Sequence, residues 1–287
     1  MTTRYHDLPD PDDIIAEKVL DHKFYTEGPA IDSEGRLYFT DLAGRHIRYL
    51  QQQQASAWAR GLRPNGQAIL HDGSHLVCDS QAACIFHYDA DGKKQRELSK
   101  GHIDGMPVRC PNDIAVDSGH GYYFTDSVRH HGAVFYASFD GSQRIVAKDI
   151  DFANGIVLTA DRKFLLIAES YKNRILQIEL TEPGQSKGSP RIFADLPVHP
   201  DRGLTGNLPD GLAIDGAGRV WVAHYGMQAL QVLSPSGELL ATYDTQIPLT
   251  SNLCFSGPYI YVTGGLAEPG PGLITRLKTG IKGIIPF

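Results

Sequence analysis

Six residues with side-chain oxygen atoms occupy the same place in six similar segments of the chain. They are Glu27, Asn65, Asn112, Asn154, Asp210 and Asn252. If the segments gather around one axis, these residues form a ring of oxygen ligands with only two formal negative charges. Carboxylate and amide oxygens, without sulfur or imidazole, are the ligands that hard divalent cations prefer. The pattern therefore predicts a cation site, with Ca²⁺ as the first choice and Mg²⁺ or Mn²⁺ next.

The same positions have a second interpretation. Asn-Gly and Asp-Gly pairs, such as residues 65–66, 154–155 and 210–211, are favoured in turns where the backbone adopts positive φ. This alternative does not explain Glu27, nor the strand-like residues that follow each pair directly. At the level of the sequence, both interpretations stay open.

The elements that must position these residues are short strands in a repeated order. Segments rich in β-branched and aromatic residues are bounded by Gly, Asp or Pro, and almost no stretch has the helical period, which indicates an all-β fold. Each copy joins two apolar strands by a polar turn and adds a third strand. The copies start near residues 27, 65, 112, 154, 210 and 252, a spacing in the range of about 40–50 residues per propeller blade.

A six-bladed β-propeller accounts for this repeat. The innermost strand of each blade lines the axial channel, so equivalent residues face one another around it. The stretch 14–20 precedes the first copy and has strand character. We expect it to form the outer strand of the last blade and to close the ring without exposed edges. An open solenoid is less favoured because no polar caps are visible. Residues 1–287 are expected to form this single domain.

Composition excludes several functions. The net charge of −6 over 287 residues, with no basic stripe, argues against nucleic acid as a partner. Apolar runs of about five residues are too short to cross a membrane, and the first residues lack the apolar stretch of a signal peptide, so we expect a cytoplasmic protein. Four cysteines without a CxxC pair fit a reduced compartment. The chain also lacks a nucleotide-binding glycine loop and the Gly-x-Ser-x-Gly and His-Glu-x-x-His motifs of other hydrolases.

Several segments together resemble the gluconolactonase and regucalcin family of six-bladed propellers. They are residues 27–30 (Glu-Gly-Pro-Ala), 110–113 (Cys-Pro-Asn-Asp), 152–155 (Phe-Ala-Asn-Gly), 208–215 (Leu-Pro-Asp-Gly-Leu-Ala-Ile-Asp) and the closing stretch 272–283. The resemblance covers essentially the whole chain. It implies one divalent metal ion, Ca²⁺ first with Zn²⁺, Mn²⁺ or Mg²⁺ as alternatives. Its implied ligands are Glu27, Asn154 and Asp210, with Asn112 contacting metal, water or substrate.

The resemblance also implies an activity. Family members open lactone rings, and a sugar lactone is the expected small-molecule substrate of this chain. We expect the protein to be a monomer or a homodimer. The metal would polarise the carbonyl, and Asp210 would take the proton of the attacking water. Nucleophilic attack by the same carboxylate is the alternative. Arg109, three residues before Asn112, is the nearest counterpart of a substrate-binding arginine.

Two other functions remain open. Related propellers hydrolyse aryl esters or phosphotriesters, and a non-catalytic propeller could hold a structural ion. The polarity of the pocket separates the substrates, since sugar lactones need several hydroxyl partners and aryl lactones need aromatic walls. Four ligands would leave about two or three positions vacant on a hard ion, which favours an enzyme over a scaffold.

Two expectations concern residues outside the ring. Glu169 is expected to pair with a backbone group or with Arg174 rather than to do chemistry. Four histidines fall where a substrate could meet them, although a structural role is more common for each. They are His130, His131, His199 and His224.

Overall fold

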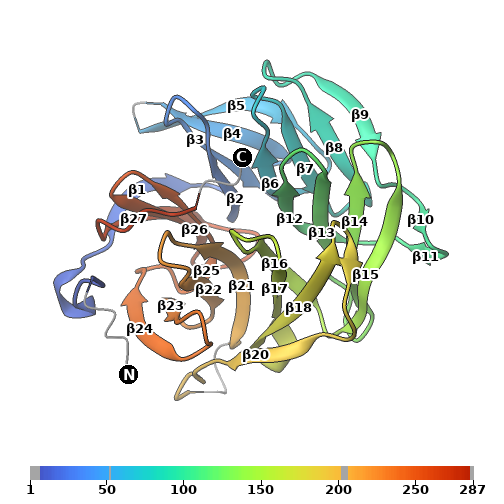
Figure 1. Cartoon of the computed structure of the whole chain (residues 1–287). Helices are drawn as coiled ribbons and strands as arrows, with labels where there is room; N and C mark the ends of the chain where they lie inside the picture. Colours follow the sequence, from blue (N-terminus) through green and yellow to red (C-terminus); the bar gives the residue numbers. More distant parts are fainter. Residues whose placement is uncertain (1–6, 52, 202–205, 285–287) are drawn as a thin grey trace.

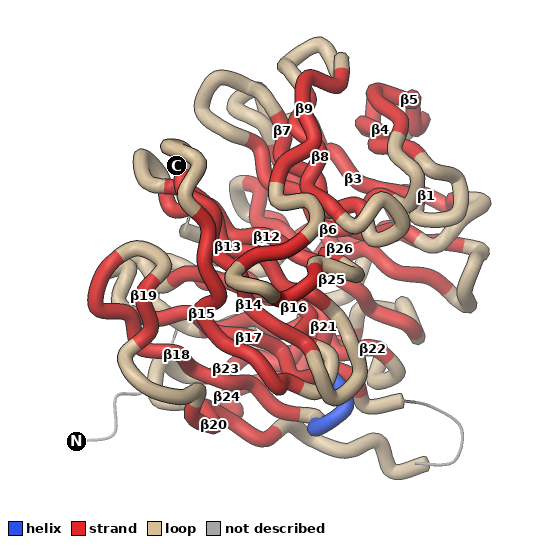
Figure 2. Tube along the Cα trace, turned by 90° about the vertical axis from the view of Figure 1, so that its right-hand side faces the viewer, coloured by secondary structure: helices blue, strands red, loops and turns tan. Residues whose placement is uncertain are grey.

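The computed structural model describes residues 7–51, 53–201 and 206–284, and nearly all of its regular structure is β-strand (Figure 2). Within those residues the helices are two short 3₁₀ segments, η1 (Pro11–Asp13) and η2 (Ser170–Lys172). None of these described helices is long and apolar enough to span a membrane.

The strands form six antiparallel sheets around a common axis (Figure 1), which we number as blades 1 to 6 in chain order. Blade 1 contains β2 (Thr26–Ile31), β3 (Leu37–Asp41), β4 (His46–Gln51) and β5 (Gln54–Arg60). Blade 2 contains β6 (Pro64–Ile69), β7 (His75–Asp79), β8 (Cys84–Tyr88) and β9 (Lys94–Leu98). Blade 3 contains β12 (Pro111–Asp117), β13 (Gly121–Asp126), β14 (Gly132–Ser138) and β15 (Gln143–Ile150), preceded by the small hairpin β10 (His102–Ile103) and β11 (Met106–Pro107).

The remaining blades repeat this order. Blade 4 contains β16 (Ala153–Leu158), β17 (Phe164–Glu169), β18 (Arg174–Glu182) and β20 (Arg191–Asp195), with β19 (Gln185–Ser186) also paired to β18. Blade 5 contains β21 (Leu208–Ile214), β22 (Val220–Tyr225), β23 (Ala229–Leu233) and β24 (Leu239–Asp244). Blade 6 contains β25 (Leu249–Ser256), β26 (Tyr259–Gly265), β27 (Gly272–Lys278) and β1 (Glu17–His22). The six-bladed propeller predicted from the repeat is confirmed.

The ring is closed by the N-terminal strand. β1 pairs antiparallel with β27, with Glu17 opposite Arg276 and His22 opposite Gly272. Figure 1 shows the two ends of the colour scale meeting in this blade. The predicted closure is therefore confirmed, at residues 17–22 within and just beyond the expected stretch. Of the expected domain 1–287, residues 1–6, 52, 202–205 and 285–287 lie outside the described residues.

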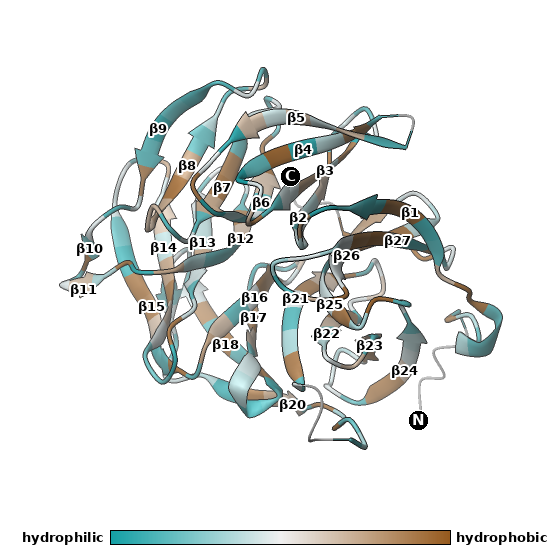
Figure 3. Ribbon diagram, turned by 180° about the vertical axis from the view of Figure 1, so that it is seen from behind, coloured by the Kyte–Doolittle hydropathy of each residue, from teal (hydrophilic) through white to brown (hydrophobic). Residues whose placement is uncertain are grey.

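The hydrophobic core is divided among the contacts between blades. Six clusters of buried apolar side chains each join two neighbouring blades, including blades 6 and 1 across the closure. Between blades 5 and 6, for example, Trp221 of β22 meets Phe255 of β25 edge to face, with ring centroids 5.8 Å apart. The outer edges are polar, as β9 and β1 show in Figure 3. Charged residues there discourage pairing with another chain.

Every inner strand is irregular near its ring residue. In all six blades the pairing between the first and second strands shifts register within three residues of that position, as between Glu27 and Ala30 in blade 1. Such bulges commonly re-aim a side chain next to a functional site. The six ring residues therefore lie at or next to bulges, where the regular pairing of the inner strands is interrupted.

The glycines that follow ring residues serve close packing between blades. A Cβ on Gly155 would lie 2.0 Å from the Asp210 carbonyl oxygen, and one on Gly211 would lie 2.0 Å from Asn252 Oδ1. Neither glycine has a positive φ. The turn interpretation of the Asn-Gly and Asp-Gly pairs is therefore wrong at these positions, because the pairs lie within strands that approach one another closely.

Candidate active site

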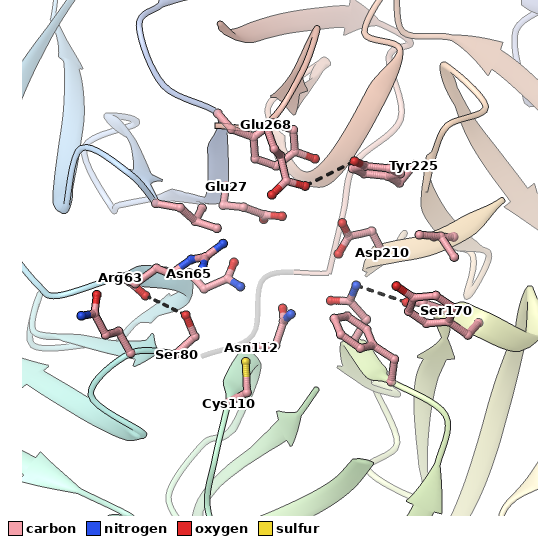
Figure 4. Close-up of a pocket in the computed structure, with 17 residues that line it drawn as sticks. Glu27, Arg63, Asn65, Ser80, Cys110, Asn112, Ser170, Asp210, Tyr225 and Glu268 are labelled. Atoms are coloured by element: carbon pink, nitrogen blue, oxygen red, sulfur yellow. Dashed lines mark hydrogen bonds between the residues drawn. The ribbon is translucent and has the colours of Figure 1, made fainter. Parts of the chain in front are cut away.

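The predicted ring of oxygen ligands, which we call the acceptor ring, surrounds one end of the channel. Five of its six members, Glu27, Asn65, Asn112, Asn154 and Asp210, line a cavity of about 470 Å³. Figure 4 shows the labelled members directing their side chains toward a common space. The sixth member, Asn252, is buried and does not line the cavity.

Two amide oxygens in this ring lack a protein partner. Asn65 Oδ1 and Asn154 Oδ1 are buried, and neither accepts a hydrogen bond. The Asn154 amide is nevertheless oriented, because its Nδ2 donates to Ser170 Oγ over 3.2 Å, and Ser170 Oγ donates to the Pro209 carbonyl over 2.7 Å. Buried acceptors without partners are costly and call for an explanation. A bound cation is an explanation that satisfies both oxygens.

The two ring carboxyl groups, Glu27 and Asp210, have raised pKa values. Burial raises the pKa of Glu27 to about 8, and the nearby charges of Asp113 and Glu268 act in the same direction. Burial also raises the pKa of Asp210 well above its usual range, reinforced by Glu27 and Asp113. These shifts are the expected result of carboxylates that are buried and crowded together. A divalent cation between them would reverse the effect.

Asp113 is a third buried carboxylate, which the sequence reasoning did not single out. Its pKa is raised to about 6, chiefly by burial, while the backbone amide of Ile156 and the Asn252 side chain donate hydrogen bonds that oppose the rise. A signal for it exists in the repeat. Asp113 stands where Gly28, Gly66 and other copies have glycine, so a charged residue at this point departs from the pattern.

The donor set fits a hard divalent cation. Among the described residues, no group of three or more His, Cys, Asp or Glu side chains is suited to hold a metal, so amide oxygens must complete any coordination here. Glu27 and Asp210 would supply the negative charge, and the cavity-lining amides of Asn65, Asn112 and Asn154 offer neutral oxygens. Oxygen-only sets of this kind suit Ca²⁺ or Mg²⁺ better than softer metals.

A second layer of residues lies two positions before the acceptor ring. Side chains two residues apart on a strand share a face, and the residue two before each lining ring member also lines the cavity. This rim layer consists of Tyr25, Arg63, Cys110, Phe152 and Leu208. The residues at the entry to the inner strands thus form a wall beside the acceptor ring. The sequence reasoning did not identify this layer, although the spacing of two was available.

The loops and strand ends after the second strands complete the cavity. The residues they contribute are Leu42, Ser80, Gln81, Ser170, Tyr171, Tyr225 and Glu268. On one side the wall is aromatic, because the Phe152 and Tyr171 rings meet edge to face at 5.4 Å and the Arg129 guanidinium covers Tyr171 at 3.5 Å. Arg129 is in turn held by Asp151 at 2.8 Å. The aromatic side is therefore braced from behind.

Arg109 and Arg63 differ in their placement. Arg109 is exposed and is not among the residues that line the cavity, and its backbone amide donates to Asp126. Its position three residues before Asn112 is out of phase with the rim layer. Arg63, two residues before Asn65, lines the cavity. The arrangement brings together Glu27, Asn112 and the other ring residues, but it does not bring Arg109 to them.

The expectations for residues outside the ring can also be compared with the structure. Glu169 pairs with Arg174 at 2.5 Å and accepts the Asp151 backbone amide at 2.8 Å, so its predicted structural role is confirmed. None of the four candidate histidines lines the cavity. His224 is buried and hydrogen-bonded to Asn173 at 2.9 Å, and burial lowers its pKa to about 3.

Comparison with known proteins agrees with this architecture. Over 268 residues the chain is 29% identical to a lactonase, drp35, of Staphylococcus saprophyticus, covering 83% of this chain and 80% of the relative. Among solved structures, a gluconolactonase from Xanthomonas campestris has a TM-score of 0.79 at 23% identity, covering 94% of this chain and 91% of that one. A calcium-binding protein, regucalcin, from Agrobacterium tumefaciens has a TM-score of 0.78 at 19% identity, covering 95% and 96%. These two structures share the fold.

A family model decides the relationship. The model described as the SMP-30/gluconolactonase/LRE-like region matches residues 25–264, which include all six acceptor-ring positions. The chain therefore belongs to the SMP-30/gluconolactonase/LRE-like family.

Proposed function

We propose that the protein is a lactonase whose acceptor ring holds one divalent cation. Glu27, Asn112, Asn154 and Asp210 are the proposed ligands, with Ca²⁺ as the first choice and Zn²⁺, Mn²⁺ or Mg²⁺ as alternatives. The observation that carries the proposal is that buried carboxylates with a raised pKa lie beside amide oxygens without hydrogen-bond partners. These groups line a cavity of ligand size. Membership of a family that includes named lactonases, and a structural neighbour described as calcium-binding, support it.

When bound, such a cation supplies Lewis-acid polarisation of the lactone carbonyl and makes water more acidic. Asp210 is the proposed general base. As the water oxygen bonds to the carbonyl carbon, its proton passes to the Asp210 carboxylate; the ring C–O bond then breaks, and the protonated Asp210 gives the proton to the leaving alkoxide oxygen. The product is a hydroxy acid. Asn154, whose amide donates to Ser170, lines the same cavity.

The cavity walls bear on the substrate. Ser80 and Gln81 offer hydrogen-bonding groups of the kind that the hydroxyls of a sugar lactone require. The braced pair Phe152 and Tyr171 instead favours the second candidate function, hydrolysis of aryl lactones or aryl esters. A panel of aldonolactones, aryl lactones and phosphotriesters, compared by kcat/KM with cation present, separates these substrates.

Substitution of the proposed base tests the mechanism. Asp210→Asn keeps the shape and an oxygen ligand but cannot accept the proton, so turnover should fall by about 10²–10⁴-fold while circular dichroism stays that of the folded wild type. Asp195→Asn, a change at an exposed residue of β20 outside the cavity, is the matched control. Retained turnover in Asp210→Asn would remove Asp210 from the role of base.

A further inference from the structure

The rim layer contains a single charged residue, Arg63. Its other members, Tyr25, Cys110, Phe152 and Leu208, are aromatic, apolar or neutral. Among all the described residues that line the cavity, Arg63 is also the one with a cationic side chain. Its register two residues before Asn65 directs it to the cavity side of the chain, and Figure 4 shows it between Glu27 and Asn65.

The Arg63 guanidinium has no protein partner in the described structure. Its backbone is fixed, since its amide donates to Asp79 over 3.0 Å and its carbonyl accepts from the Ser80 amide over 3.1 Å. No ion pair or hydrogen bond involves its side chain, in contrast to Arg129, which pairs with Asp151 behind the aromatic wall. An anchored backbone with a free guanidinium suits recognition of a ligand rather than support of the fold.

The charges around Arg63 would orient an anionic ligand in the cavity. Glu268 lines the cavity from the loop between β26 and β27 in blade 6, where Tyr225 Oη donates to it over 3.3 Å. Phe152 and Tyr171 belong to blade 4, on the far side of the channel from blades 1 and 2. A ligand with one anionic group would be repelled by Glu268 and attracted to Arg63. Its less polar part would then reach toward the aromatic side.

We propose that Arg63 determines specificity by binding an anionic substituent, such as a carboxylate, on the lactone substrate. This inference rests on the proposed lactonase function and narrows it from lactones in general to acidic lactones. The planar guanidinium can donate two parallel hydrogen bonds to a carboxylate, a geometry that a neutral hydroxymethyl group cannot match. The lactone carbonyl would lie over the acceptor ring, and the acidic group would lie toward blade 2.

The test compares two lactones that differ in one group. Glucaro-1,4-lactone carries a carboxylate where glucono-1,4-lactone carries a hydroxymethyl group. Arg63→Gln should lower kcat/KM for the acidic lactone by about tenfold, mainly through KM, because it removes charge-assisted hydrogen bonds that the exposure of Arg63 to solvent already weakens. The neutral lactone should change less than about twofold. Arg60→Gln, at an exposed arginine of β5 outside the cavity, should change neither.

Two further variants sharpen the assignment. Glu268→Gln should lower KM for the acidic lactone relative to the neutral one, because it removes the opposing charge. Arg109→Gln tests the arginine that the sequence singled out. An equal loss on both lactones in Arg63→Gln, or a selective loss in Arg109→Gln instead, would overturn the proposal.

A binding measurement keeps the inference separate from the activity. Pyroglutamate is a lactam with a carboxylate that lactonase chemistry does not open, and pyroglutamide is its neutral counterpart. Titrated into the Ca²⁺-supplemented wild type, pyroglutamate should bind more tightly, and Arg63→Gln should abolish that preference. If no lactone is hydrolysed but this preference is present, the lactonase proposal fails and the anion site stands. If lactones are hydrolysed without any preference for the acidic forms, the anion site fails alone.

Discussion

Glu27→Gln should stabilise the cation-free protein while abolishing its response to Ca²⁺. Glu27 is 5% exposed, and its pKa rises from 4.5 to about 8 on folding. A carboxyl group with a raised pKa is compatible with the fold while it is protonated. Its penalty is absent below pH 4.5, grows as the pH rises, and is complete near pH 8. Glutamine mimics the protonated form at every pH and avoids this penalty.

The size of the effect follows from the same pKa values. One pH unit between the unfolded and folded pKa contributes about 1.4 kcal/mol, so the variant should exceed the wild type by up to about 3 kcal/mol at pH 7. The two should converge near pH 4.5. Urea unfolding in chelator at pH 4.5, 6 and 7 measures this difference. Glu238→Gln, at an exposed glutamate, is the control and should follow the wild type.

Addition of Ca²⁺ should remove most of this difference between the variant and the wild type. A cation that binds only the folded state adds about 2.7 kcal/mol at a hundred times its dissociation constant. The wild type should gain this stability, and Glu27→Gln should gain much less because it has lost a charged ligand. The reasoning is refuted if Glu27→Gln is no more stable than the wild type in chelator at pH 7, or if Ca²⁺ stabilises both proteins equally.

Two further predictions concern the fold. Burial lowers the pKa of His224 to about 3, so its contribution to stability is complete above pH 6.5 and is lost as the pH falls toward 3. In urea unfolding, the free energy of unfolding of His224→Gln should therefore rise relative to that of the wild type by about 1.4 kcal/mol for each pH unit below 6.5. Parallel pH profiles for the two proteins would contradict this. Arg219 pairs with buried Asp215 at 2.6 Å and with exposed Asp7 at 2.7 Å. Arg219→Met should therefore cost about 3–5 kcal/mol in unfolding free energy and Asp7→Asn less than about 1 kcal/mol, and similar losses in both would show that burial of Asp215 is not the cause.

The repeat made the fold and the acceptor ring predictable. Equivalent positions in a closed propeller must face one another, so Glu27 and Asp210 could be placed on one axis although 183 residues separate them. The rim layer follows from strand alternation, but the bulges that aim the inner strands are a property of the folded blades. The sequence analysis did not single out Arg63 as a cavity residue. It named Arg109 as the candidate substrate-binding arginine because Arg109 lies close to Asn112 along the chain.

Other parts of the site had no repeated signal. Glu268 comes from the loop after β26 and Tyr225 from the end of β22, and at the position of Tyr225 blades 2 and 4 have the smaller Ser80 and Ser170. The meeting of Glu268 and Tyr225 at 3.3 Å depends on how blades 5 and 6 pack, which the pattern within one blade does not encode. Asp113 could have been noticed, because it replaces a glycine of the repeat, but its burial beside Glu27 required the three-dimensional structure.

The central claim is that the acceptor ring holds a divalent cation required for lactone hydrolysis. The most direct test strips the purified protein with a chelator and follows acid release from aldonolactones and aryl lactones before and after one equivalent of Ca²⁺, Mn²⁺ or Zn²⁺ is restored. The account predicts that hydrolysis is lost on stripping, returns at one ion per chain, and does not return in Glu27→Gln. Full activity in the stripped protein would contradict it.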